Sequence, residues 1–107
     1  MQKRTILIDR DEYERFQRIL DAGKQVRSDV WVPLHKTYLV DFGGGIEADI
    51  QVCNGERPYV IGTLYNGDFE VATTDPSEEL LGEYTFDHEG RIYVVEIQVK
   101  QEIKVKA

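Results

Sequence analysis

Hydrophobic and polar positions predict one amphipathic helix near the N-terminus. Asp9 is a typical N-cap, and Glu12 three residues later completes a capping box. Gly23 is a typical C-cap. Between them the apolar residues recur at helical spacing, as Tyr13, Phe16, Ile19 and Leu20. The pattern therefore predicts a helix over about residues 10–22.

Further along the chain, the period changes to two, which is typical of half-buried strands. A first short strand is predicted at Thr5–Ile8, before the helix. A β-meander is predicted over about residues 37–99, with turns at Gly43–Gly45, Asn54–Gly55, Asn66–Gly67 and Glu89–Gly90. Because Ile92–Val95 is apolar on both faces, we expect it to lie centrally in the sheet.

Two other segments give weaker patterns. Val30–Val32 could form a short strand that Pro33 ends. Asp75-Pro76-Ser77-Glu78 resembles a second capping box with proline at the first helical position, so a short helix is predicted at about 76–81. The tail after Lys100 either continues the last strand or frays.

The predicted fold is α+β: one N-terminal helix packed on a mainly antiparallel meander of about five to seven strands. A meander curled into a partial barrel is an alternative. The chain has 107 residues, 41% of them hydrophobic and 31% charged, and shows no linker or repeat. That size suits one domain over residues 1–107.

Cysteine usage and hydropathy suggest a compartment. Cys53 is the one cysteine, so no disulfide forms within the chain, and a reducing, cytoplasmic location is expected. The N-terminal apolar run is too short for a signal peptide, and nothing approaches the ~20 apolar residues of a membrane helix. No membrane association is expected.

The charge is distributed unevenly along the chain, whose net charge is −7. Residues 37–90 carry 12 acidic residues and one basic residue, Arg57, whereas residues 1–36 and 91–107 are each net basic. Direct binding to nucleic acid by the central segment is disfavoured, because phosphate contacts need Lys and Arg. A basic protein surface, such as that of a nucleic-acid-binding protein, is the expected partner.

Alternation predicts which carboxylates point away from the core. If the strands that carry them are neighbours, their carboxylates share one face, which either keeps the protein soluble or copies the charge array of a nucleic acid. The predicted partner-binding residues are Glu47, Asp49, Asp68, Glu70, Glu83 and Asp87.

Residues that could carry catalysis or bind metal are few. His88 lies in a predicted turn, where a solvated position explains it. His35 is the better candidate general base, and Cys53 the candidate nucleophile, but no sequence context supports a catalytic pair. The chain lacks the ligand patterns of zinc and calcium sites. We therefore expect no catalytic residue, no metal and no cofactor.

In size, acidity and lack of motifs, the chain is similar in general type to the small inhibitors that phages and mobile elements deploy against host defence systems, such as anti-CRISPR proteins. This similarity implies no particular functional residue. The main hypothesis is a non-enzymatic acidic binding protein or inhibitor. The alternatives are an accessory domain that associates through its helix or a sheet edge, including a homodimer through the strand from Arg91 toward Val105, and a small enzyme that uses His35.

Overall fold

The computed structural model of the protein describes residues 1–25, 37–53 and 59–101. One helix and seven strands lie within these residues, and the predicted α+β class is confirmed at that level. The elements are β1 (Gln2–Ile8), α1 (Arg10–Gln25), β2 (Thr37–Gly43), β3 (Ile46–Cys53), β4 (Tyr59–Asn66), β5 (Phe69–Thr73), β6 (Gly82–His88) and β7 (Arg91–Val99).

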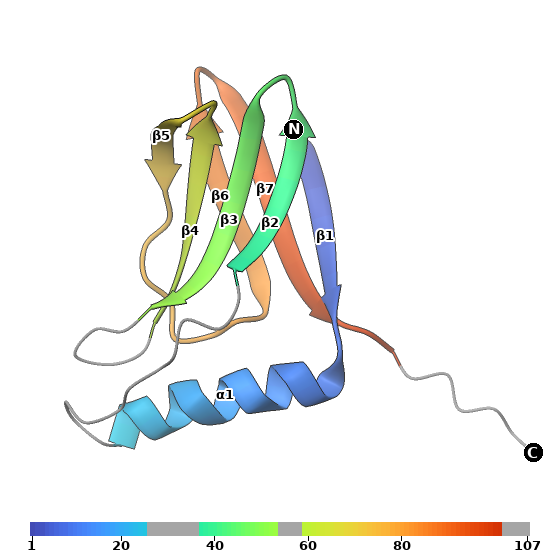
Figure 1. Ribbon diagram of the computed structural model, residues 1–107, viewed down its shortest axis with the longest axis vertical. Helices are drawn as coiled ribbons and strands as arrows, with labels where there is room; N and C mark the ends of the chain where they lie inside the picture. The colour runs from blue at the N-terminus through green and yellow to red at the C-terminus, as the bar shows by residue number, and fades with distance from the viewer. Residues whose placement is uncertain (26–36, 54–58, 102–107) are drawn as a thin grey trace, which may run out of the picture.

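The strands form two sheets that face each other, with α1 across one end (Figure 1). Four antiparallel strands make one sheet in the order β2-β3-β4-β5. The other has the order β1-β7-β6, in which β1 runs parallel to β7 and β6 antiparallel to it. The central position expected for residues 92–95 is confirmed, since β7 lies between two partners.

The prediction of one continuous meander over residues 37–99 is wrong. The meander covers only β2 to β5, after which the chain crosses to the second sheet, and the two sheets do not close into a barrel. The reason is that β1 pairs with β7. The β6–β7 hairpin therefore forms a separate sheet with β1 and does not continue the meander. The predicted turn at 54–55, the predicted strand at 30–32 and the tail from residue 102 lie outside the described residues.

The helix begins where the capping pattern predicts, with the Tyr13 amide donating to the Asp9 carbonyl over 3.0 Å. It ends at residue 25, three residues later than predicted, because Gly23 lies inside it and one interior glycine costs only about 1 kcal/mol. Phe16 and Leu20 are buried at the end of the sandwich. Phe16 meets the Tyr38 ring edge-on at 6.3 Å.

The prediction of a short helix at 76–81 is also wrong. Ser77 instead exchanges two backbone hydrogen bonds with Val60 on β4, of 2.8 and 2.9 Å. Its hydroxyl accepts from the Glu79 amide over 3.1 Å, which makes a local turn. Proline and serine favour turns as well as helix starts, and here pairing with Val60 of β4 decides between the two.

The tight hairpins were predicted closely. The turns fall at Gly44–Gly45 and Glu89–Gly90 as expected, and the turn between β4 and β5 is Gly67–Asp68, one residue later than predicted. Glu89 and Gly90 both have positive φ, 52° and 74°, which is typical of a type I′ turn.

The core lies between the two sheets and continues to the helix. The most completely buried side chains come from both sheets, from the connection between them and from α1: Leu20, Ile50, Val60, Leu64, Leu80, Phe86, Val95 and Ile97. Side chains from both sheets pack closely against Gly62 of β4, where an added Cβ would lie 2.9 Å from Ile50 Cδ1 and 2.9 Å from Phe86 Cζ. Glycine is therefore required there by space.

Candidate functional site

The outer face of the four-stranded sheet is polar and acidic. On β3, Ala48 and Ile50 are buried in the core, so alternation turns Glu47 and Asp49 to the opposite face, as predicted. On β2, buried Phe42 places Asp41 on that same outer face. The alternation that the sequence predicts for β3 is therefore confirmed.

The register brings carboxylates from three strands, and a tyrosine from the fourth, into one row. Asp41 of β2 lies opposite Glu47 of β3, Glu47 lies opposite Tyr65 of β4, and Tyr65 lies opposite Glu70 of β5. Asp49 lies in the neighbouring row on β3. We call Asp41, Glu47, Asp49 and Glu70, with Tyr65 among them, the acidic face.

No cation neutralises the acidic face within the part of the chain that the structure describes. None of its four carboxylates has an ion pair there. Asp41 accepts a 2.7 Å hydrogen bond from the Gly43 amide at the end of its own strand. Arg57, the one basic residue of the acidic segment, lies outside the described residues. Like charges directly opposite each other, such as Asp41 and Glu47, destabilise a sheet.

Asp49 is the least exposed member of the acidic face, at 7%. Its Oδ2 accepts a 3.1 Å hydrogen bond from Gln51 Nε2, but its Oδ1 is buried and has no hydrogen-bond partner among the described residues. Burial raises the pKa of Asp49, and the negative charge of Glu70 adds to this, while Gln51 and the Tyr65 hydroxyl oppose it. The carboxylate is therefore held in an unfavourable environment.

Tyr65 shares that environment from β4. Burial raises the pKa of Tyr65, and the negative charges of Asp49 and Glu70 raise it further. The hydroxyl thus stays protonated and remains a hydrogen-bond donor between carboxylates. An amphipathic ring in this position is typical of residues that contribute strongly to protein interfaces.

One large apolar side chain is exposed on the acidic face. Leu39 of β2 is 74% exposed and lies opposite Asp49 in the register. Phe69, at the start of β5, is 77% exposed, but it lies opposite Asn66, so alternation directs it to the other face of the sheet from Glu70. An acidic surface that also offers apolar contacts suits a protein partner better than a simple ion.

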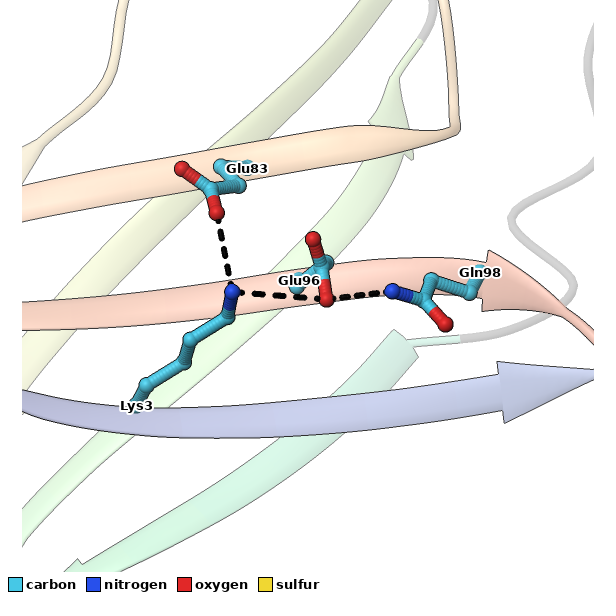
Figure 2. A network of polar contacts seen from close by, with 4 residues as sticks. All are labelled: Lys3, Glu83, Glu96 and Gln98. Carbon is cyan, nitrogen blue, oxygen red and sulfur yellow. Dashed lines mark hydrogen bonds and ion pairs between the residues drawn. The ribbon is translucent and has the colours of Figure 1, made fainter.

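The other predicted site residues lie elsewhere, so the expected single face for all six is not formed. Asp68 lies in the β4–β5 turn, at the margin of the sheet. Glu83 and Asp87 are on β6 in the other sheet. Glu83 accepts a 3.0 Å hydrogen bond from Lys3 Nζ, which also lies 3.5 Å from Glu96 Oε1 (Figure 2). The carboxylate of Glu83 is therefore already matched by a cation.

Sequence reasoning missed Asp41 and Tyr65. Alternation alone places Asp41 outward, but its position beside Glu47 follows from the register, and the register depends on the Gly44–Gly45 turn and an irregularity between Asp41 and Gly43. Tyr65 reaches the same row only through the pairing of β4 with both neighbours.

The structure offers little for catalysis in the described residues. His88 is not a solvated turn residue as predicted: it ends β6, its side chain is 16% exposed, and Nε2 is buried without a hydrogen bond. Its nearest acidic atom among the ion pairs is Glu89 Oε1, at 3.9 Å. His35 lies outside the described residues. No group of three or more His, Cys, Asp or Glu residues in the described segments could hold a metal ion.

Comparison with known proteins adds no relative. No family model matches the chain, and no curated protein or solved structure is significantly similar to it. Among the described residues, no helix is both long enough and apolar enough to cross a membrane.

Proposed function

We propose that this protein is a non-enzymatic binding protein whose acidic face docks on a basic surface of another protein. One observation carries the proposal: four carboxylates from three strands share the face, and no described cation pairs with any of them. The predicted residues Glu47, Asp49 and Glu70 belong to this site, with Asp41 and Tyr65 added. Asp68 flanks it.

The unfavourable energy of placing these carboxylates together favours a binding function over a role in solubility alone. Solubility needs only exposed charge, whereas Asp49 is only 7% exposed, and Asp41 opposes another carboxylate. Natural proteins tend to tolerate such unfavourable local electrostatics and burial at functional sites. Lys and Arg side chains from a partner would relieve the repulsion between these carboxylates.

The chemistry of the face also restricts the partner. Phosphates of nucleic acids and anionic lipid headgroups would be repelled, because each needs basic residues in contact. A protein groove rich in Lys and Arg, of the kind that binds nucleic acid, would be attracted and steered at low ionic strength. The finer proposal is therefore an inhibitor that occupies such a groove in competition with nucleic acid.

The test compares two double variants with equal net charge. Glu47→Gln/Glu70→Gln removes two charges from the acidic face, and Glu14→Gln/Glu89→Gln removes two from the helix and the β6–β7 turn. Tagged wild-type protein is used to capture partners from lysate at low and at high salt. A captured partner is then purified, and its binding to each variant is measured by calorimetry with and without duplex DNA as competitor.

We expect the acidic-face variant to weaken binding about tenfold or more, since charge-assisted contacts contribute about 1.5–3 kcal/mol each when well packed. The control variant should bind like wild type, and DNA should compete. Equal weakening by both variants, or binding that salt leaves unchanged, would rule out the acidic face as the interface.

A second candidate rests on the open sheet edges. Among the described strands, β1, β2, β5 and β6 each end a sheet, so each offers one row of backbone groups that no described strand pairs with. Association through such an edge, with another protein or with a second copy, would be insensitive to salt and to the Glu47 and Glu70 substitutions. The same experiment therefore separates the two candidates.

A further inference from the structure

The outer face of the four-stranded sheet has two unlike halves. Nearest the β2–β3 turn is the row of Asp41, Glu47, Tyr65 and Glu70, which belongs to the acidic face. From this turn β3 runs toward the end of the sandwich where α1 lies (Figure 1). In that direction the outward-facing side chains of the described strands are uncharged, apart from Asp49 at the boundary between the halves.

The register identifies the apolar members of the uncharged half. Leu39 of β2 lies opposite Asp49 of β3. Ile61 of β4 lies one row further toward α1, and Cys53 and Tyr59 pair in the row after that. Alternation turns these side chains outward, because the apolar residues between them on each strand lie in the core or against it. We call Leu39, Cys53, Tyr59 and Ile61 the apolar patch.

The apolar patch is accessible and is not part of the core. Leu39 is 74% exposed, whereas Cys53, Tyr59 and Ile61 are each partly exposed. None of the four belongs to the core or to the side chains packed against it. Apolar area removed from water by a partner is worth about 25 cal/mol per Å². Apolar side chains grouped on an exposed face, with polar residues around them, are typical of surfaces that bind proteins.

The two halves together restrict the chemistry of a partner. A strand rises about 3.4 Å per residue, so Leu39 lies about 7 Å from the acidic row and Ile61 about 14 Å from it. A uniformly basic surface would cover the apolar patch with charge, and a uniformly apolar surface would bury carboxylates without a cation. A segment that complements both halves therefore has Lys or Arg at one end and apolar side chains at the other, two to four residues apart if it is extended.

We propose that the outer face of this sheet binds an extended segment of the partner protein that carries apolar side chains at one end and Lys or Arg at the other. The apolar end packs on Leu39 and its neighbours, and the basic end meets the acidic row. Attraction by the carboxylates then raises the association rate, whereas packing on the apolar patch slows dissociation. The inference rests on the function proposed above and adds the polarity of the segment that binds.

The test is an NMR titration of the full, ¹⁵N-labelled chain with four heptapeptides blocked at both ends. The first is Leu-Ser-Leu-Ser-Lys-Ser-Lys, in which apolar and basic side chains lie at opposite ends of one face of an extended chain. The second has the same composition in the order Leu-Ser-Lys-Ser-Lys-Ser-Leu. The third replaces both leucines by serine, and the fourth replaces both lysines by glutamine. We expect saturable shifts of amides in both halves with the first peptide, and binding about threefold weaker or worse with each of the others.

Matched variants connect the result to each half of the face. Leu39→Ala should weaken binding of the first peptide about threefold and leave the serine peptide unchanged. Leu7→Ala is the control, because Leu7 is a leucine that is 53% exposed on β1 of the other sheet, and it should change neither peptide. Glu47→Gln/Glu70→Gln should weaken both, since both carry the two lysines.

The outcomes separate this inference from the proposed function. Equal binding of the first, second and serine peptides, or equal effects of Leu39→Ala and Leu7→Ala, would overturn the inference and leave the proposed function standing. Equal binding of the first and glutamine peptides would instead remove the proposed function, because the carboxylates would then recognise no positive charge. The absence of any saturable shift with the first peptide would also overturn the inference.

Discussion

At the scale of single residues, Asp49 links stability and proposed function. Its folded-state pKa is raised by burial above the ordinary value of 3.8, so the folded state binds the proton more tightly than the unfolded state does. Stability from this group is therefore fully present below about pH 3.8 and falls as the pH rises through the raised folded-state pKa. At neutral pH the charged carboxylate lowers the free energy of unfolding.

We expect Asp49→Asn to raise the free energy of unfolding at pH 7 by on the order of 1 kcal/mol, because the buried charge disappears. The gain should vanish below about pH 3.8, where both proteins are neutral at this position. Urea unfolding at pH 3.5 and 7 measures the difference. The same variant should bind the basic partner more weakly. A destabilised Asp49→Asn at pH 7 would contradict the assignment of strain to this carboxylate.

Gly62 lies where the core leaves little room for a side chain. An added Cβ would lie 2.9 Å from side-chain atoms of Ile50 and Phe86, which fill the gap between the sheets. We expect Gly62→Ala to lower the free energy of unfolding by about 1–3 kcal/mol through overpacking. Gly62→Ala/Phe86→Leu, which frees part of that space, should recover part of the loss. Thermal unfolding measures both variants, and an unchanged midpoint for Gly62→Ala would show that the sheets can separate at little cost.

At the scale of elements, the attachment of the helix depends on a polar contact as well as on apolar burial. The Tyr38 hydroxyl on β2 donates a 2.9 Å hydrogen bond to Glu12 Oε1 in the first turn of α1. Phe16 lies against the same tyrosine ring. The start of the helix is thereby tied to the first strand of the four-stranded sheet.

We expect Tyr38→Phe to lower the free energy of unfolding by about 1–2 kcal/mol, because a hydrogen bond to a charged acceptor is lost while the ring contact is kept. Glu14→Gln, on the exposed side of the same helix, serves as the control and should change it by less than about 0.5 kcal/mol. Denaturant unfolding monitored by circular dichroism gives both values. Equal effects of the two substitutions would mean that the Tyr38–Glu12 contact contributes nothing specific.

The elements also show which parts of the fold the sequence could predict. Helix start, strand positions and the Glu89–Gly90 turn depend on neighbours in sequence, and those predictions hold. The division into two sheets depends on pairing between β1 and β7, which lie at opposite ends of the described chain, and no local pattern encodes it. The helix predicted at 76–81 failed for a related reason, since Ser77 finds a distant partner in Val60.

The same distinction applies to the candidate site. The outward direction of Glu47 and Asp49 follows from alternation within one strand and was predicted. Which other carboxylates lie near them was not predicted. Glu70 lies on the same face because of the register across β4, whereas Glu83 lies on the other sheet and pairs with Lys3. Tyr65 carries no charge, so the uneven charge distribution of the sequence gave no reason to single it out.

At the scale of the whole molecule, the two outer faces differ in their charge balance. On the three-stranded sheet, Lys3 lies between Glu83 and Glu96 and offsets part of their charge (Figure 2). On the four-stranded sheet, the acidic face has no cation among the described residues. Among the described residues, a cation therefore offsets carboxylates on the outer face of the three-stranded sheet, and none does so on the acidic face.

This imbalance predicts how stability responds to salt. At an ionic strength of about 0.01 M the Debye length is about 30 Å, and repulsion within the acidic face is felt in full, whereas at about 0.15 M it is about 8 Å. We expect the midpoint of thermal unfolding to rise by a few degrees between these conditions. In Glu47→Gln/Glu70→Gln the rise should be clearly smaller, since the repelling charges are gone. The matched variant Glu14→Gln/Glu89→Gln should respond to salt like the wild-type protein. If instead both variants lose the response equally, repulsion comes from total charge and the acidic face stores no strain of its own; a partner would then gain nothing by neutralising that face in particular.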